Sequence, residues 1–346
     1  MKNKILKVVK DLIYWKKYYA IETNADEIER SINLTNFTSA GKSFDFVVFE
    51  KNTAAPNILI SPGFGGHSYV FAELAYLMHL NGFNVFIMPK HGGVMVNELI
   101  SRHRDALEYI VDNYNAQIGV FGEGLGAYAT FYLSLECNLI KSAAYMNGPV
   151  IMNEKKFRDA WSEGNGAAKR RKKIFRVAKF LNKIFPWIKF PIRSYLDFKE
   201  MIETKKENRI IETRLIQEGF FKDPDFDTWN PLSAIMSLVY TPPPKSLSEL
   251  KVPTMFLVPL RGFFPSYEKD LFNWLPAVRK KIIEVDGGVF WMLSHPKEAA
   301  KIISEWFDET LIVKAVESNL NKINLYENVI KSRKISCITG GSIQDD

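Results

Sequence analysis

The stretch from Gly119 to Thr130, GVFGEGLGAYAT, joins an apolar run, a glycine-rich turn and the start of a helical pattern. Gly122, Gly124 and Gly126 alternate with other residues in the turn. This spacing is typical of a nucleophile elbow, where the flanking positions are small because the central residue has a strained backbone and the helix packs closely. The central position of an elbow holds the nucleophile, and here it is Gly124.

A dinucleotide-binding loop is the less favoured interpretation of the same turn. The G-x-G-x-x-G pattern requires a third glycine later than Gly126, and no phosphate-binding lysine follows. The residues on both sides alternate between short apolar runs and longer helical patterns from Phe44 onward, which indicates an α/β protein with a mainly parallel sheet covered by helices. We expect strands at 44–50, 57–62, 84–89, 117–122, 142–149, 252–259 and 281–286.

The regular alternation is interrupted between about residues 150 and 250, where the chain is basic, aromatic and broken by prolines. This pattern predicts a helical insertion after about the sixth strand. Between Lys155 and Arg193 there are thirteen Lys or Arg and two acidic residues, whereas the whole chain has a formal charge of +7. A solvated helical face is the first interpretation of this block, an anionic lipid surface is the second, and a nucleic acid is the least favoured partner.

Composition excludes several classes of protein. Of the 346 residues, 47% are hydrophobic, which is enough for a sizeable core. The two cysteines, Cys137 and Cys337, are far apart, so the sequence predicts neither a disulfide framework nor a zinc site. With no signal-peptide pattern and no apolar run of spanning length, we expect a cytoplasmic protein that could contact a membrane peripherally. The basic amphipathic pattern of residues 1–20 favours packing on the core over such a contact.

Four segments together resemble α/β-hydrolases of the lysophospholipase and monoglyceride-lipase-like group. They are ISPGFGGHSYVFAELAYLMHLNGFNVFIMPKHGG (60–93), GVFGEGLGA (119–127), VPTMFLVPLRGFFPSY (252–267) and VDGGVFWMLSHPKEAAKIISEWF (285–307). The resemblance covers about residues 44–307 and implies an α/β-hydrolase fold with an inserted helical cap. The implied units are an N-terminal amphipathic helix and lead-in (1–43), a core in two parts (44–150 and 251–308), a basic and aromatic cap (151–250), and a C-terminal helix and tail (309–346).

The resemblance places the catalytic triad on residues that lack its chemistry. The serine falls on Gly124, the acid on Gly262 or within one residue of it, and the histidine on Val289. Glycine offers no nucleophile, and valine can neither accept nor return a proton. The other strand that supplies the acid in some enzymes of this fold ends at Asn147, which is no carboxylate. The resemblance therefore predicts a degenerate triad, and we prefer a natural pseudoenzyme to an engineered chain.

Other candidate residues follow from their places around the turn. The backbone amides of Phe64 and Leu125 are where the resemblance implies an oxyanion hole. Ser61 and Ser68 offer hydroxyls near that loop, but no base can be assigned to either from sequence. The residues expected to line or border the pocket are His67, Glu123, Asn147, Phe263, Phe290 and Trp291. We expect no metal and no cofactor, since no histidine pair has the spacing of a helical metal site.

Three functional hypotheses remain open from sequence. The first is a catalytically degenerate protein that binds an acyl or apolar ligand, or a protein partner, without classical hydrolysis. The second is an enzyme with relocated or non-hydrolytic chemistry that uses Glu123, His67 or backbone donors. The third is an esterase or lysophospholipase-type serine hydrolase, if the triad lies elsewhere. The basic cap and the N-terminal helix are the expected contacts with an anionic membrane surface.

Overall fold

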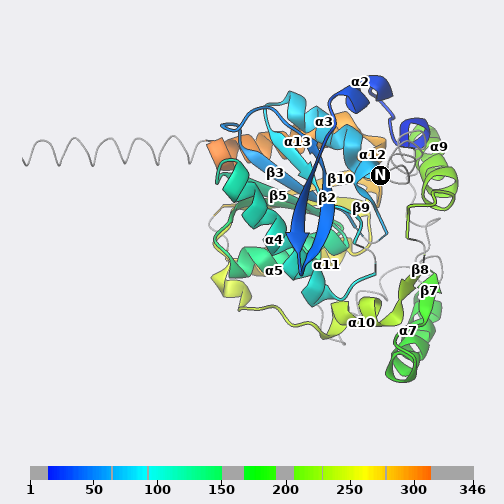
Figure 1. Cartoon of the computed structure of the whole chain (residues 1–346). Helices are drawn as coiled ribbons and strands as arrows, with labels where there is room; N and C mark the ends of the chain where they lie inside the picture. The colour runs from blue at the N-terminus through cyan, green and yellow to red at the C-terminus, as the bar shows by residue number, and fades with distance from the viewer. Residues whose placement is uncertain are drawn as a thin grey trace, which may run out of the picture.

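The computed structural model describes residues 15–63, 65–91, 93–149, 167–191, 206–227, 229–276 and 279–312. A single eight-stranded sheet runs through the centre of the molecule in the order β1-β2-β4-β3-β5-β6-β9-β10 (Figure 1). The strands span Asn33–Ser39 (β1), Lys42–Phe49 (β2), Asn57–Ser61 (β3), Asn84–Ile87 (β4), Ile118–Glu123 (β5), Ile140–Met146 (β6), Thr254–Arg261 (β9) and Lys280–Gly288 (β10).

The sheet is parallel from β4 to β10, and only β1 and β2 pair antiparallel with their neighbours. Every residue of β3, β4 and β5 is buried, as expected for strands covered on both faces. The prediction of an α/β fold with a mostly parallel sheet is confirmed. The carboxyl ends of β3, β5, β6, β9 and β10 therefore lie along one edge, which is where side chains can meet in such a sheet.

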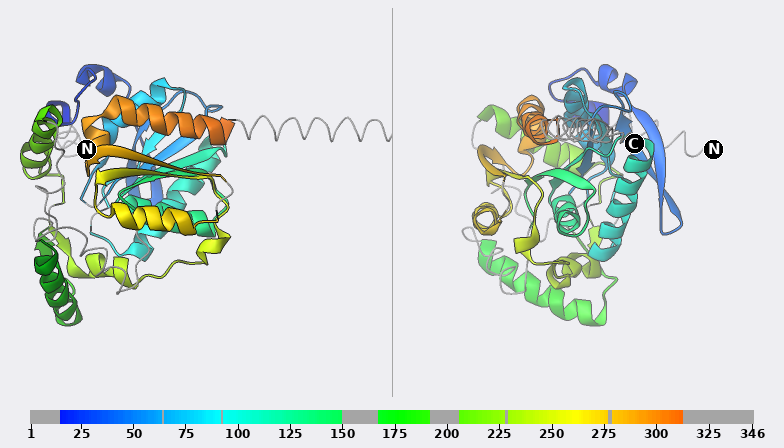
Figure 2. Two further views of the ribbon diagram at one scale, coloured as in Figure 1. Left: turned by 180° about the vertical axis from the view of Figure 1, so that it is seen from behind. Right: turned by 90° about the vertical axis from the view of Figure 1, so that its left-hand side faces the viewer.

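Two layers of helices cover the sheet (Figures 1 and 2). One apolar cluster contains side chains of α4 (Val96–Asn113), α5 (Leu125–Glu136) and α11 (Pro265–Trp274). The other contains side chains of α3 (Ala72–Leu80), α12 (Trp291–Ser294) and α13 (Pro296–Phe307). In α5 eleven of the twelve residues are buried, because this helix packs both on the sheet and under its neighbours.

The sheet begins before residue 44, where we placed the start of the core. β1 pairs with β2 through the tight turn at Ala40 and Gly41, both at positive φ. Its sequence, NLTNFTS, is polar at five of its seven positions and buries only Phe37 and Ser39, so it gives a weak strand signal. The core also continues past residue 308, because the π-helical turn η5 (Asp308–Ile312) buries Thr310 and Leu311.

The insertion follows β6, as predicted, but it contains strands as well as helices. Its described elements are α7 (Ala167–Ile184), β7 (Lys189–Pro191), α9 (Lys206–Arg214), the π-helical turn η3 (Leu215–Phe220), β8 (Trp229–Pro231), α10 (Leu232–Tyr240) and the short turn η4 (Leu247–Glu249). β7 and β8 form an antiparallel ribbon. The insertion lies along one side of the sheet domain, and α7 projects at its lower end in Figure 1.

The predicted N-terminal helix lies mostly outside the described residues, as does the predicted C-terminal helix and tail from residue 313 on. Residues 15–18 are helical and continue toward the short helix α2 (Ala25–Arg30). Trp15 and Tyr19 are buried in the cluster that contains α3 and α13. This end of the segment therefore packs on the core. No helix among the described residues is long and apolar enough to cross a membrane.

Candidate functional site

Gly124 is the residue between β5 and α5, at the edge where the parallel strands end. Its backbone has φ 53° and ψ −116°, a conformation in which a side chain is strained. The Gly124 N–H donates to the Met146 carbonyl at 3.0 Å and ties the turn to β6. The sharp turn expected from GVFGEGLGAYAT is therefore present as backbone geometry.

The two flanking glycines are required by packing. A Cβ atom on Gly122 would lie 2.5 Å from Ala127 Cα. A Cβ on Gly126 would overlap the Ser61 carbonyl oxygen and lie 2.6 Å from the Pro62 carbonyl oxygen. Strand β5, helix α5 and the end of β3 thus approach one another too closely for any side chain at either position.

Glu123 precedes the turn and its side chain is buried. The Asn147 Nδ2 group donates to Glu123 Oε1 at 3.3 Å, and the Gly63 N–H also bonds to the carboxylate. Burial raises the pKa of Glu123 to about 7 and outweighs these two hydrogen bonds. The carboxyl group connects the turn to the loop after β3, where a Cβ on Gly63 would overlap it.

Asn147 lies between the ends of β5, β9 and β10. Its backbone has φ 54°, and its Nδ2 donates to the Val289 carbonyl at 2.8 Å. Its Oδ1 is buried and has no hydrogen-bond partner, and a Cβ on Gly262 would lie 2.8 Å from that oxygen. The structure therefore brings Glu123, Gly262 and Val289 together around one amide side chain.

Glu268 is a third buried polar group here, and sequence reasoning missed it. It lies on α11 and accepts a hydrogen bond of 2.5 Å from the Gly148 N–H through Oε1, while its Oε2 is buried without a partner. Burial raises the pKa of Glu268 well above its ordinary value, and the nearby charge of Glu123 adds to the effect. In the sequence PSYEKDLFNW this glutamate is indistinguishable from a surface residue.

A pH-dependent stability follows from Glu123. Below its ordinary pKa of 4.5, both the folded and the unfolded protein hold the proton, whereas between 4.5 and about 7 only the folded protein does. The free energy of unfolding should therefore fall as pH rises through this window, by about 3 kcal/mol for this group.

The variant Glu123→Gln should remove that fraction of the pH dependence, measured by urea unfolding at several pH values between 4.5 and 8. Glu268→Gln should also reduce the slope, since the pKa of its carboxyl group is raised too. An unchanged slope in Glu123→Gln would show that this carboxyl does not hold its proton in the folded protein.

Of the residues that follow β10, some are buried in the core and one is partly exposed at the edge of the sheet where the parallel strands end. Val289 is buried, and Trp291 is buried against Gly287, where an added Cβ would lie 2.6 Å from the indole Cγ. Phe290 is half-buried and packs on Phe220 of the insertion, with ring centroids 4.5 Å apart. Phe263 is also half-buried. Of the expected pocket aromatics, Phe290 and Phe263 thus remain partly open to solvent, whereas Trp291 belongs to the core.

Of the two backbone amides expected to form an oxyanion hole, only that of Leu125 belongs to the described residues. Phe64 lies outside the described residues. Leu125 is the first residue of α5, so its N–H has no carbonyl partner within its own helix. The positive end of a helix is a favourable place for a carbonyl or carboxylate oxygen.

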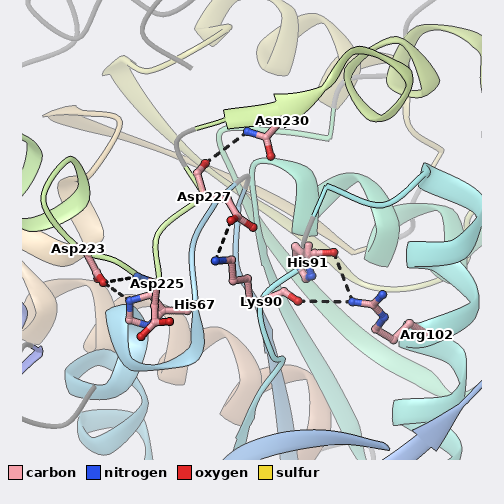
Figure 3. A network of polar contacts seen from close by, with 8 residues as sticks. All are labelled: His67, Lys90, His91, Arg102, Asp223, Asp225, Asp227 and Asn230. Carbon is pink, nitrogen blue, oxygen red and sulfur yellow. Dashed lines mark hydrogen bonds and ion pairs between the residues drawn. The ribbon is translucent and has the colours of Figure 1, made fainter. Parts of the chain in front are cut away.

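His67 forms a buried network with the insertion (Figure 3). Its Nε2 is 2.6 Å from Asp223 Oδ2, and the Tyr19 hydroxyl donates to the same oxygen at 2.6 Å. The Asp225 N–H donates to Asp223 Oδ1 at 2.9 Å. Burial by itself would raise the pKa of Asp223, but the bond and charge of His67 and the bond from Tyr19 outweigh it and lower the pKa. We call Tyr19, His67 and Asp223 the clasp.

The insertion also contacts the loop after β3 directly. The Asp227 N–H donates to the Gly65 carbonyl at 3.0 Å, and the Asp227 carboxylate is 2.7 Å from Lys90 Nζ (Figure 3). A Cβ on Gly65 would lie 3.0 Å from the Phe226 ring. Residues 223–227 therefore cover the loop that carries Gly63 and Gly65.

Comparison with known proteins identifies the architecture. No family model matches the chain, and no curated protein is similar to it in sequence. Among solved structures, the complex of DcsB with its substrate analogue has a TM-score of 0.60 at 16% identity and covers 82% of this chain and 100% of its own. A monoacylglycerol lipase from Paleococcus ferrophilus has a TM-score of 0.56 at 16% identity, covering 81% and 99%.

A soluble variant of monoglyceride lipase from Saccharomyces cerevisiae, in complex with a substrate analogue, has a TM-score of 0.59 at 14% identity over 85% of this chain and 98% of its own. The chain has the α/β-hydrolase fold. At these identities the likeness establishes the architecture alone.

The described part of the α/β-hydrolase fold contains a buried serine–histidine pair that resembles a nucleophile and its base. Ser61 Oγ is 2.6 Å from His103 Nε2, and His103 Nδ1 is 2.8 Å from the Leu99 carbonyl. Since Nδ1 must donate to that carbonyl, Nε2 accepts from the Ser61 hydroxyl. Burial lowers the pKa of His103 to about 4, and both side chains are inaccessible to solvent beneath Gly126. The pair therefore has a structural role.

The remaining polar groups beside this pair are also structural. His91 is buried, its Nε2 bonds to the Pro62 carbonyl at 2.7 Å, and burial lowers its pKa well below the ordinary value. Arg102 holds the backbone of the same loop through the carbonyls of Lys90 and His91 (Figure 3). Within the described part of the α/β-hydrolase fold, no three His, Cys, Asp or Glu side chains gather as a metal site would require.

Proposed function

We propose that this α/β-hydrolase-fold protein binds an apolar, acyl-type ligand at the end of β5 without hydrolysing it. The observation that carries the proposal is Gly124, which keeps the strained elbow backbone but supplies no nucleophilic atom. Gly262 and Val289, at the ends of β9 and β10, supply no acid and no base. We propose that these three residues occupy the positions of a lost triad.

The neighbouring polar groups do not replace that chemistry. Acyl transfer through a serine needs an oxygen nucleophile, a base that accepts its proton and a group that orients the base. Asn147 is an amide that cannot exchange a proton near neutral pH, and it is bonded to the Val289 carbonyl. Glu123 has a suitable pKa, but the turn beside it presents only the hydrogen atom of Gly124.

Features that favour binding remain. The N-terminus of α5 at Leu125 offers backbone N–H groups to a carbonyl or carboxylate oxygen. Half-buried aromatic side chains at Phe226, Phe263 and Phe290 border the same edge of the sheet. Apolar side chains around a few fixed polar donors are typical of small-molecule sites. A ligand with an acyl chain and one carbonyl group matches this combination.

The test combines covalent labelling, turnover and analysis of bound lipid. We expect no labelling by a fluorophosphonate probe, no turnover of p-nitrophenyl esters, and an acyl lipid in the organic extract of the purified protein by mass spectrometry. The variant Phe290→Asp should lose the lipid, whereas Trp274→Ala, on the surface of α11, should keep it. Labelling of any serine together with ester turnover would refute the proposal and favour a serine hydrolase. A protein that never retains lipid would favour a protein partner instead.

A second candidate function is supported by the clasp. His67 and Asp223 form a hydrogen-bonded pair beside the loop after β3, an arrangement in which the carboxylate orients the imidazole as a general base. Chemistry relocated to His67 would act without a covalent serine intermediate. Turnover by a protein that the probe does not label, and that His67→Gln abolishes, would establish this alternative over simple binding.

A further inference from the structure

Helix α7 has an apolar stripe on its outer side. Val177, Phe180 and Ile184 are exposed and are spaced by three and four residues, so they lie on one face of the helix. The other side of α7 packs against α10 and buries Ala178. The outward stripe is therefore additional to the face that holds the helix on the protein.

The stripe continues into the ribbon that follows the helix. Phe185 and Trp187 are exposed beyond the end of α7, with ring centroids 5.8 Å apart. Trp229 on β8 is exposed as well and pairs with Pro191 on β7. Backbone bonds from Leu232 to Ile188 and from Ser233 to Pro186 fix this region on α10. We call the six exposed side chains the docking face: Val177, Phe180, Ile184, Phe185, Trp187 and Trp229.

Exposure of these side chains is large for apolar residues. Phe180 is 63% exposed, Trp187 68% and Trp229 55%. Single apolar residues on a surface are ordinary, but several large ones over adjacent elements mark an interaction site. In Figures 1 and 2, α7 and the ribbon lie at one end of the molecule, beyond the helical layers that cover the sheet.

The segment that carries five of the six docking-face residues has charge of one sign. Residues 167–191 contain nine Lys or Arg and no Asp or Glu. Arg176 and Lys183, on α7, and Lys189, on β7, are exposed, and none of the three has an ion-pair partner among the described residues. An occupant that is both apolar and negatively charged at its border would complement this surface.

We propose that the docking face binds the surface of an anionic lipid bilayer. Tryptophan and phenylalanine insert at the level of the headgroups, aliphatic residues reach the acyl chains, and flanking cations attract anionic headgroups. Single-stranded RNA would use the cations and aromatic rings, but it has no use for exposed Val177 and Ile184. The proposal concerns a surface separate from Gly124 and does not depend on the proposed function.

Vesicle binding tests the proposal with the full chain. The protein should co-sediment with vesicles of phosphatidylcholine mixed with phosphatidylglycerol, and much less with phosphatidylcholine alone. Phe180→Ser combined with Trp187→Ser should weaken binding about tenfold or more, because two large apolar side chains no longer leave water. Trp274→Ser is the matched control, since Trp274 is 53% exposed on α11, and should bind as the wild type does.

Two further experiments test the role of the cations beside the docking face and the depth to which its tryptophans enter the bilayer. Arg176→Glu combined with Lys183→Glu should abolish the preference for phosphatidylglycerol, and added salt should weaken wild-type binding. Brominated lipids should quench tryptophan fluorescence in the wild type, and Trp187→Phe combined with Trp229→Phe should lose most of that quenching. Thermal unfolding of each variant checks that it remains folded.

Several results would overturn the proposal. One is a wild type that does not bind the mixed vesicles. Another is a loss of binding in Trp274→Ser equal to that in the double serine variant. Unchanged binding in the folded serine and glutamate variants would place the vesicle contact on other residues of this chain. Binding of RNA oligonucleotides without vesicle binding would assign the face to nucleic acid.

Discussion

Replacing Gly126 with alanine is expected to lower the free energy of unfolding by ~3 kcal/mol or more, at the upper end of the cost of overpacking. The added methyl group would overlap the backbone carbonyl of Ser61 and lie 2.6 Å from that of Pro62. Neither oxygen belongs to a flexible side chain, so β3 and α5 would have to move apart. That movement would also disturb the bond between Ser61 and His103.

Gly66→Ala is the control for this variant. A Cβ at Gly66 would lie 3.4 Å from the Pro62 Cβ, which is ordinary van der Waals contact, so its cost should be below ~1 kcal/mol. Both variants are compared by urea denaturation followed by circular dichroism. Equal stability of the two would show that α5 does not approach β3 as closely as the structure indicates.

Replacing Asp223 with alanine is expected to cost about 3 to 5 kcal/mol, because it breaks a buried hydrogen-bonded pair. His67 and the Tyr19 hydroxyl would both lose a contact of 2.6 Å, and the Asp225 amide would lose its acceptor. The insertion would then be held on the loop after β3 mainly by Asp227. We therefore also expect faster limited proteolysis within the insertion.

Asp227→Ala is the matched control for Asp223→Ala, since it removes a carboxylate four residues later. The ion pair of Asp227 with Lys90 is partly exposed, and its backbone bond to Gly65 survives the substitution. Its cost should be ~1 kcal/mol or less. Because the pKa of Asp223 is lowered by folding, the difference between wild type and Asp223→Ala should be complete above its ordinary value of 3.8 and shrink as pH falls below it. Equal costs for the two alanine variants would contradict a buried clasp.

Much of the fold could be predicted because many of its strands and helices have a recognisable local pattern of apolar residues. β3, β4 and β5 are short, wholly buried and mostly apolar, and helix α4 between β4 and β5 has a regular apolar period. β1 was missed because an edge strand with one exposed face can carry Asn and Thr at most positions. The ribbon of β7 and β8 was missed because it has three residues on each side and ends in proline.

The candidate site was predictable only where its residues are close in sequence. The glycines around residue 124 form a local pattern, so the turn could be anticipated. The pairing of His67 with Asp223 joins residues 156 positions apart, and nothing near DPDFD marks Asp223 as buried. Glu268 reaches Gly148 across 120 positions in the same way. Contacts of this kind depend on how the layers assemble.

The clasp has a consequence for where this protein can be divided. Tyr19 precedes the sheet, His67 lies between β3 and β4, and Asp223 lies in the insertion. The Tyr19 ring also stacks on the Phe220 ring of the insertion, with ring centroids 5.7 Å apart. A fragment that starts at residue 44 would discard Tyr19 together with β1. Such a fragment would lose the hydrogen bond from Tyr19 to Asp223, which helps to hold residues 223–227 over Gly65. The residues ahead of β1 therefore help to hold the insertion on the sheet domain, and we expect a fragment without them to be less stable.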